Sequence, residues 1–197
     1  MIRRERAGLP LAWVVALMTG LFGCAPTDGA IFEVADTDSD GDSEALETTA
    51  PSADVPAGAH CEPVAVWDEA SAAAEEEMLE LINQQRAAGA YCAPATHTLD
   101  LAPELRCAAR LHSKDMVERD FYSTINPDGL SPGDRVYAAG YDGSIWGENV
   151  TRGYVTAADA MADLMSSESL CINIMDPDYR YIGLGRFGAS WTQDYGS

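Results

Sequence analysis

The chain has few cationic residues and few histidines. Its 197 residues include 12 Lys and Arg against 32 Asp and Glu, with three His. Removal of the N-terminal segment described below would leave 9 basic and 31 acidic residues, a formal charge of −22. A charge of this size and sign keeps a protein soluble and repels the phosphate backbone of nucleic acids. We therefore expect no nucleic-acid partner.

The sequence also lacks the spacings that mark common catalytic and metal centres. It contains no His-x-x-x-His pair and no Cys/His set of the zinc-binding type. Ser113 and Ser166 have no evident base, so a serine nucleophile is unsupported. His60 and His97 fall in spacer and loop segments. His112 lies on the apolar face of a predicted helix, where we expect a buried, hydrogen-bonded core residue.

The only long apolar run lies at the N-terminus. Three arginines precede an uncharged stretch from residue 7 to residue 23, followed by Cys24. Basic residues, an apolar run and a small residue before the cleavage point are the parts of a secretory signal, and the stretch is short for a membrane-spanning helix, which is the alternative. Leu21-Phe22-Gly23-Cys24 is similar to a bacterial lipobox. We therefore predict a lipoprotein signal peptide over residues 1–23 and a lipid on Cys24 that anchors the protein to a membrane. Ala25 stands where an Asp would favour inner-membrane retention, so we expect an outer-membrane lipoprotein of the cell envelope.

Residues 24–60 have the composition of a spacer. They are acidic, contain no Lys or Arg, and have no periodic apolar residues, so we predict a disordered tether that repels itself. One part matches the EF-hand loop pattern D-x-D-x-D-G-x5-E, and its oxygen ligands would suit Ca²⁺. The weak calcium candidates are Asp36, Asp38, Asp40, Asp42 and Glu47. An acidic Ser/Asp-rich spacer also produces this pattern by chance, and we expect no other cofactor.

The cysteine count fits an exported domain. Lipidation of Cys24 removes the odd member of five and leaves four, enough for two disulfides in an oxidising compartment. Four cysteines allow three pairings. We favour Cys107–Cys171 together with Cys61–Cys92.

Residues 61–197 have the periodic texture of one compact domain. Helices are predicted from about Asp68 to Ala88, with Glu75 to Glu77 on a solvated face, from about Pro103, and from Thr156. Two segments, 181–187 and 190–195, are predicted to pair as an antiparallel hairpin. Helices followed by strands indicate the α+β class.

Several short motifs of this domain follow one another in a characteristic order. They are LINQQRA from residue 81, AARLHSKDM from 108, NPDG from 126, AGY from 139, GEN from 147, NIMDP from 173, IGLG from 182 and WTQ from 191. In this respect the chain resembles the CAP superfamily, also called the SCP domain, in its short bacterial form. The resemblance implies an α-β-α sandwich with a central antiparallel sheet.

The resemblance also implies a cleft, from which this chain departs. Family members often hold two His and two acidic residues there, sometimes around a divalent metal. Here Thr124 and Leu170 stand at the histidine positions, while Glu148 is retained and Glu168 stands where Pro or Glu is common. Two carboxylates without imidazoles make a poor zinc site. They leave weak Ca²⁺ binding or an acid pair with one raised pKa as alternatives.

Three functions follow, from different classes. The lost imidazoles and the tether favour a non-catalytic, monomeric binding module for a protein partner or a small ligand. The resemblance also implies a carrier of lipid or sterol. A hydrolase using Glu148 and Glu168 is the third hypothesis, since acid–base catalysis needs a matched pair in reach of the substrate.

Overall fold

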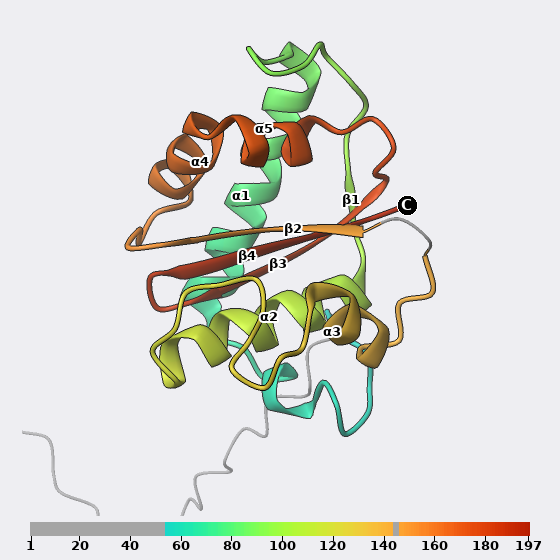
Figure 1. Ribbon diagram of the computed structural model, residues 1–197, viewed down its shortest axis with the longest axis vertical. Coiled ribbons are helices and arrows are strands. Elements are labelled where there is room, and N and C mark those ends of the chain that lie inside the picture. Colours follow the sequence, from blue (N-terminus) through green and yellow to red (C-terminus); the bar gives the residue numbers. More distant parts are fainter. Residues whose placement is uncertain (1–53, 144–145) are drawn as a thin grey trace, which may run out of the picture. The chain divides into compact units, whose positions relative to one another are not determined.

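The computed structural model describes residues 54–143 and 146–197 (Figure 1). The predicted signal peptide, the lipid site Cys24, most of the tether and the calcium candidates between residues 36 and 47 lie outside these residues. The helices are α1 (Glu69–Ala88), α2 (Pro103–Glu118), α3 (Pro132–Ala138), α4 (Ala157–Ser166) and α5 (Glu168–Met175), with a 3-10 turn over Glu62–Val64. The strands are β1 (Asp100–Leu101), β2 (Trp146–Arg152), β3 (Tyr181–Phe187) and β4 (Ser190–Gly196).

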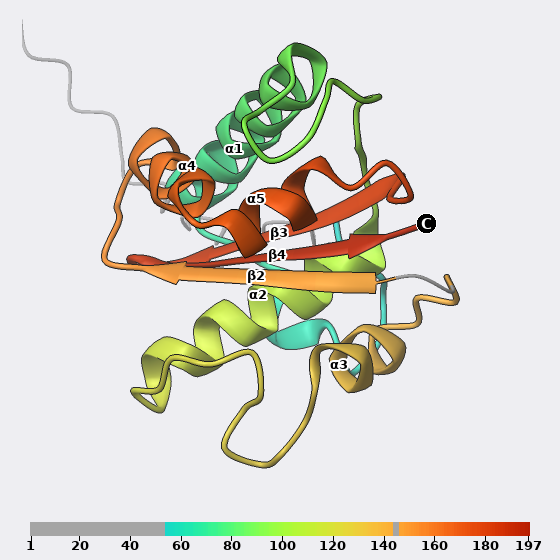
Figure 2. The same cartoon turned by 45° about the horizontal axis from the view of Figure 1, so that its top comes forward.

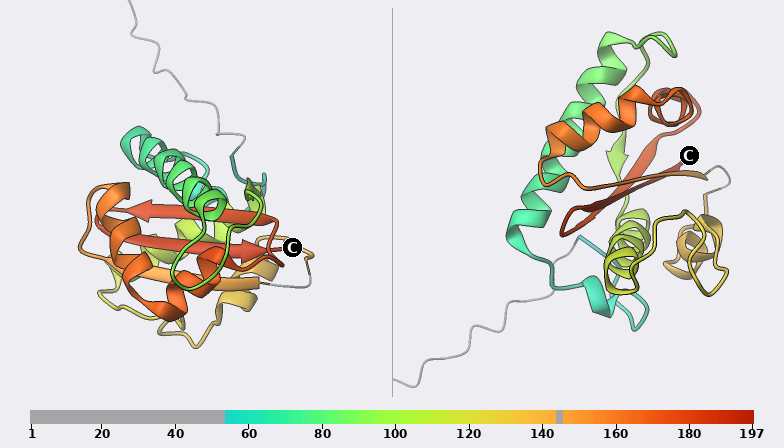
Figure 3. Two further views of the ribbon diagram at one scale, coloured as in Figure 1. Left: turned by 90° about the horizontal axis from the view of Figure 1, so that it is seen from above. Right: turned by 60° about the vertical axis from the view of Figure 1, so that its left-hand side comes forward.

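Three layers form the domain. The sheet has the strand order β1-β3-β4-β2 and separates α1, α4 and α5 on one face from α2 and α3 on the other, as Figures 1, 2 and 3 show. The predicted α+β sandwich is confirmed. β2, β3 and β4 pair antiparallel, but the short β1 pairs parallel to β3, so the sheet is mixed.

The hairpin and helix α2 form the centre of the fold. The predicted hairpin is confirmed as β3 and β4. Helix α2 packs directly on β3 at two glycines. A Cβ at Gly183 or Gly185 would collide with the backbone of Leu105 or Ala109, so the lack of a side chain there allows the close approach. The predicted apolar face of α2 is buried, including His112.

The predicted helix starts are accurate, but the exposure predicted for Glu75 on α1 is wrong. Asp68 caps α1 by accepting a hydrogen bond from the backbone N–H of Ser71, and Thr156 caps α4 through the N–H of Asp159. Glu75, expected on a solvated face, is fully buried because Arg110 donates to its carboxylate at 2.7 Å. Its neighbours Glu76 and Glu77 are exposed.

The favoured disulfide pairing is wrong. The structure joins Cys61 to Cys107 and Cys92 to Cys171. Cys107 lies on α2 in the core between α2 and α3, whereas Cys171 lies on α5 in the core of the opposite face. The sheet therefore separates the two cysteines that we expected to pair.

The domain begins before the predicted boundary at residue 61. Val55 is buried in the same core as Cys61 and Val64. Residues 54–67, which we call the N-terminal strap, pack against the outer side of α2 and α3. At the end of the strap, Trp67 lies against the Arg110 guanidinium and the Phe187 ring. Residues 54–60 therefore belong to the domain and not to the spacer.

Candidate functional site

Glu148 lies in the edge strand of the sheet, and its side chain points inward. It belongs to β2, directly opposite Asp194 of β4. The side chain is 1% exposed and faces α2 and α3. Glu148 is thus part of the domain interior.

Arg135 is the main partner of Glu148. Its Nη2 donates to Glu148 Oε2 at 2.5 Å, and the Arg135 side chain is only 7% exposed. The same guanidinium donates to the backbone carbonyls of Thr124 and Leu130, each at 3.0 Å. Arg135 therefore fixes both ends of the loop over residues 124–130 to the edge strand. Its own helix is held in place by a capping box at Ser131 and Asp134.

His112 adds a neutral imidazole to this cluster. Its Nε2 lies 2.9 Å from the carbonyl of Ser123 and 3.7 Å from Glu148 Oε1. Because a carbonyl only accepts, Nε2 carries the proton and Nδ1 is an acceptor. Burial, and then the charge of Arg135, lower the pKa of His112 to about 4. The predicted buried, hydrogen-bonded histidine is confirmed, but its position beside Glu148 was not foreseen.

Asp194 completes the cluster and is 1% exposed. Burial raises its pKa well above the ordinary range, and the adjacent Glu148 carboxylate raises it further. Burial also raises the pKa of Glu148, against the opposing charge of Arg135. Two carboxyl groups in one buried site favour a shared proton, because both cannot be ionised at low cost.

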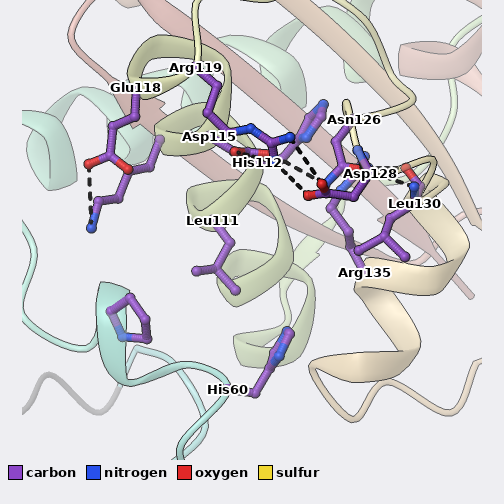
Figure 4. A pocket seen from close by; sticks show the side chains of 12 residues that line it. His60, Leu111, His112, Asp115, Glu118, Arg119, Asn126, Asp128, Leu130 and Arg135 are labelled. Atoms are coloured by element: carbon purple, nitrogen blue, oxygen red, sulfur yellow. Dashed lines mark hydrogen bonds and ion pairs between the residues drawn. The ribbon is translucent and has the colours of Figure 1, made fainter.

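An open groove lies over one side of this cluster (Figure 4). It has a volume of about 290 Å³, and His112 and Arg135 are among its lining residues. The strap contributes His60 and Pro63, and α2 contributes Leu111. The remaining lining comes from α2 and the segment that follows it: Lys114, Asp115, Glu118, Arg119, Asn126, Asp128 and Leu130.

The charged side chains around this groove are paired with one another. Arg119 donates to both oxygens of Asp128, at 2.5 and 3.1 Å, and also contacts Asp115. Lys114 lies 3.8 Å from Glu118. Figure 4 shows Arg119 and Asp128 next to Asn126, with Leu111 and His60 farther along the groove. A ligand therefore meets the apolar side chains of Pro63, Leu111 and Leu130 between polar and ion-paired residues.

The four predicted cleft residues divide into two groups. Thr124 and Glu148 are brought together by Arg135, which binds both. Glu168 and Leu170 lie on α5, on the opposite face of the sheet, where Asn149 donates to the carbonyl of Leu170. Glu168 is exposed at the start of that helix. The structure therefore does not bring Glu168 to the Glu148 carboxylate.

Sequence reasoning missed Arg135 and Asp194. One available signal was the position of Asp194 within a predicted strand, between Gln193 and Tyr195, because an Asp in the middle of a strand is uncommon. A buried acid needs a partner, and its register partner on β2 is an acid. Arg135 gave no comparable signal, since its partners are distant in sequence.

The residues present do not fit a metal ion in the cleft. The carboxylate of Glu148 is bonded to Arg135, and the two family histidine positions carry Thr124 and Leu170. Within the described residues, no group of three His, Cys, Asp or Glu side chains is placed to hold a metal ion.

In the same part of the chain, no helix is long and apolar enough to cross a membrane.

A comparison with known proteins identifies the family that this chain matches. Residues 79–195 match the cysteine-rich secretory protein family, CAP. The protein YkwD of Bacillus subtilis, described as uncharacterized, is 29% identical over 123 residues, which are 61% of this chain and 46% of that protein. The chain thus spans less than half the length of this curated relative.

Solved structures share the fold. An extracellular protein containing an SCP domain from Bacillus anthracis superposes with a TM-score of 0.60 at 21% identity, over 64% of this chain and 41% of that one. An outer surface protein of Borrelia burgdorferi gives a TM-score of 0.52 at 15% identity, over 62% and 88% of the two chains. The order of the helices, the mixed sheet and the family match agree, and the chain belongs to the cysteine-rich secretory protein (CAP) family.

Proposed function

We propose that this protein is an exported, lipid-anchored binding module whose groove beside α2 takes a ligand or a segment of a partner without chemical turnover. The observation that carries the proposal is the withdrawal of Glu148 from solvent. Its carboxylate is bonded to Arg135 and 1% exposed, while the groove on the other side of Arg135 is open. The Glu148 carboxyl group therefore faces the interior and not the groove.

The geometry disfavours the hydrolase hypothesis. A general acid or base must come within hydrogen-bond reach of the substrate. Glu148 and Glu168 lie on different faces of the sheet, and the His112 side chain is fully buried. The groove, in contrast, is open and offers a ligand a few apolar side chains together with polar and ion-paired residues.

Export is supported by three observations. The N-terminus has the features of a lipoprotein signal ending at Cys24. The structural relatives from Bacillus anthracis and Borrelia burgdorferi are described as extracellular and outer-surface proteins. The two disulfides of the domain suit an oxidising compartment. An outer-membrane lipoprotein with its domain on an acidic tether is the arrangement we propose.

The test combines ligand detection with a blocked groove. The mature exported protein, in mild detergent, is screened by native mass spectrometry for co-purifying ligand and by ligand-detected NMR against a library of small uncharged compounds. Leu111→Arg places a long cation in the groove, and we expect it to weaken binding of any hit by at least about tenfold, the loss of one well-buried apolar contact. Ile172→Arg, an equally drastic change at an exposed site of α5, serves as the matched control.

Two results would contradict the proposal. One is a bound compound whose affinity Leu111→Arg leaves unchanged. The other is substrate turnover by the purified protein that Glu148→Gln abolishes.

A further inference from the structure

In the buried cluster beneath the groove, the carboxylate oxygens of Glu148 and Asp194 outnumber their hydrogen-bond donors. Glu148 Oε2 accepts from Arg135, but Glu148 Oε1 and both oxygens of Asp194 have no partner among the described residues when both groups are ionised. Unpaired buried carboxylate oxygens are costly. A proton between the two carboxyl groups pairs Glu148 Oε1 with one Asp194 oxygen and leaves a single oxygen without a partner, because a protonated acid donates a hydrogen bond to its neighbour.

The surroundings decide which group keeps that proton. Glu148 faces the Arg135 guanidinium at 2.5 Å, and this cation favours its ionised form. Asp194 is deeper and lies beside the Glu148 carboxylate, which favours the neutral acid. The cluster then holds one cation and one anion, with His112 neutral.

Arg135 connects this pair to the surface. Its two carbonyl contacts hold the ends of the 124–130 loop. Within the loop, Asn126 Oδ1 accepts from the backbone N–H groups of Asp128 and Leu130. Asn126, Asp128 and Leu130 line the groove. Arg135 therefore positions both ends of this wall of the groove, while Arg119 and Asp115 on the side of α2 bind Asp128 and Asn126 within it.

We propose that Glu148 and Asp194 share one proton, and that the single remaining negative charge holds Arg135, and with it the 124–130 loop, in place as a wall of the groove. Asp194 acts as a neutral acid that orients Glu148, and Glu148 acts as a positioning residue for the groove. Binding of a second proton removes the partner of Arg135 and releases the loop. Only this last link, from loop to ligand, rests on the proposed function.

In the part of the chain that the structure describes, the groups that face Glu148 do not supply a substitute charge. They are Asp194 from β4, Arg135 from α3 and the neutral His112 from α2. From β3, Gly183 lies opposite Asp194 and has no side chain. From α5, Asn173 reaches only the backbone carbonyl of Glu148. When Arg135 leaves, Glu148 loses the cation that held it ionised and binds a proton more tightly, so acidification favours the released state.

The first experiment needs no ligand. In the mature protein with ¹³C-labelled Asp and Glu, NMR at pH 7 should show one carboxyl carbon of this pair with the shift of a protonated acid, and Asp194→Asn should remove that signal. A spectrum in which every Asp and Glu carboxyl group is ionised at pH 7 would overturn the shared proton.

The second experiment separates the two carboxyl groups by amide hydrogen exchange. Glu148→Gln, which imitates the doubly protonated pair, should speed exchange in the 124–130 loop about tenfold to a hundredfold, the loss of a hydrogen bond to a charged group. Asp194→Asn keeps the donor and the single charge, so its loop should exchange within about twofold of the parent. Glu77→Gln, an exposed change of the same kind on α1, is the control, and amides of α1 report whether each variant stays folded.

The outcomes distinguish the proposals. Equal effects of Glu148→Gln and Asp194→Asn on the loop, or no effect of Glu148→Gln, would overturn the positioning role of Glu148. A loop that is released in Glu148→Gln, with the affinity of an identified ligand unchanged, would instead overturn the groove as the binding site.

Discussion

At the scale of single residues, burial decides which groups of the site carry charge. His112 is surrounded by α2, Phe121 and the carbonyl of Ser123, and the nearest carboxylate oxygen is that of Glu148 at 3.7 Å. Its imidazole is neutral at physiological pH because burial disfavours the charged form and because protonation would place a second cation beside Arg135. The site thus keeps one buried ion pair instead of a charged network.

His112 gives a prediction about stability and pH. Its pKa is about 4 in the folded protein and near 6.5 when unfolded. Because the folded pKa is the lower one, the unfolded chain binds the proton first, and stability is lost as pH falls from about 6.5 to about 4. This single group should contribute a loss of about 3 kcal/mol across that window. Urea unfolding at several pH values should show the loss in the parent and not in His112→Gln.

The comparison with a second histidine isolates the effect. His60→Gln, at an exposed position of the strap, should leave the pH profile unchanged. The buried Glu148, Asp194 and Glu75, whose pKa values are raised, act in the opposite direction in all three proteins. Parallel profiles for the parent and His112→Gln would show that the histidine titrates as it does when unfolded.

Glu75 shows why a sequence pattern misplaced some buried charges. It lies in a run of three glutamates, a composition that indicates solvent exposure. In the structure its carboxylate accepts hydrogen bonds from Trp67, Arg110 and the backbone N–H of Arg186. These partners lie in the strap, in α2 and in β3, and no local pattern brings them together.

At the scale of elements, prediction succeeded where a local signal existed. The capped starts of α1 and α4, the proline at the start of α2 and the two-residue turn of the hairpin are encoded by neighbouring residues. Helix α3 and helix α5 are 7 and 8 residues long, too short for an apolar period to be seen. The disulfide pairing failed because it depends on which side of the sheet each cysteine occupies.

The observed pairing gives a prediction about the strap. Cys61–Cys107 closes a sequence separation of 46 residues, and Cys92–Cys171 one of 79. By chain entropy each bridge contributes about 4 kcal/mol to stability. The double variant Cys61→Ser/Cys107→Ser should lose about this much and should also release the strap, since the bridge ties the segment that carries Val55 and Val64 to α2. Limited proteolysis should then cut within residues 54–67.

The other bridge is the control for this experiment. Cys92→Ser/Cys171→Ser should lose a similar free energy of unfolding, because its loop is also long, but the strap should stay resistant to protease. Equal cleavage of the strap in both double variants would show that the strap is held by overall stability and not by its own bridge.

At the scale of the whole molecule, the family and layer order followed from the sequence, but the site did so only in part. The ordered motifs indicated the fold through their resemblance to a known family. Glu148 and the backbone carbonyl of Thr124 meet at Arg135, whereas Arg135 and Asp194 became partners of Glu148 only through the packing of α3 and the register of β4 with β2. Side-chain partners across the sheet are a property of the assembled layers.

The negative charge of the molecule gives a prediction about salt. The described residues contain 9 Lys and Arg against 23 Asp and Glu, and exposed acids such as Glu69, Glu77 and Glu80 share one helix. Like charges that folding brings together repel one another, and this repulsion is screened as the Debye length falls from about 30 Å at 0.01 M to about 8 Å at 0.15 M salt.

Raising NaCl over this range should therefore increase the free energy of unfolding, by an amount on the order of 1 kcal/mol, because the exposed ion pairs that salt weakens are worth little each. The triple variant Glu69→Gln/Glu77→Gln/Glu80→Gln should be more stable than the parent at low salt and should respond less to NaCl. It leaves Glu76 in place, whose bond to Arg106 is attractive. Denaturant unfolding at both salt concentrations decides the sign. A parent that salt destabilises would mean that its surface pairs, such as Arg119 with Asp128, outweigh the repulsion of the whole molecule.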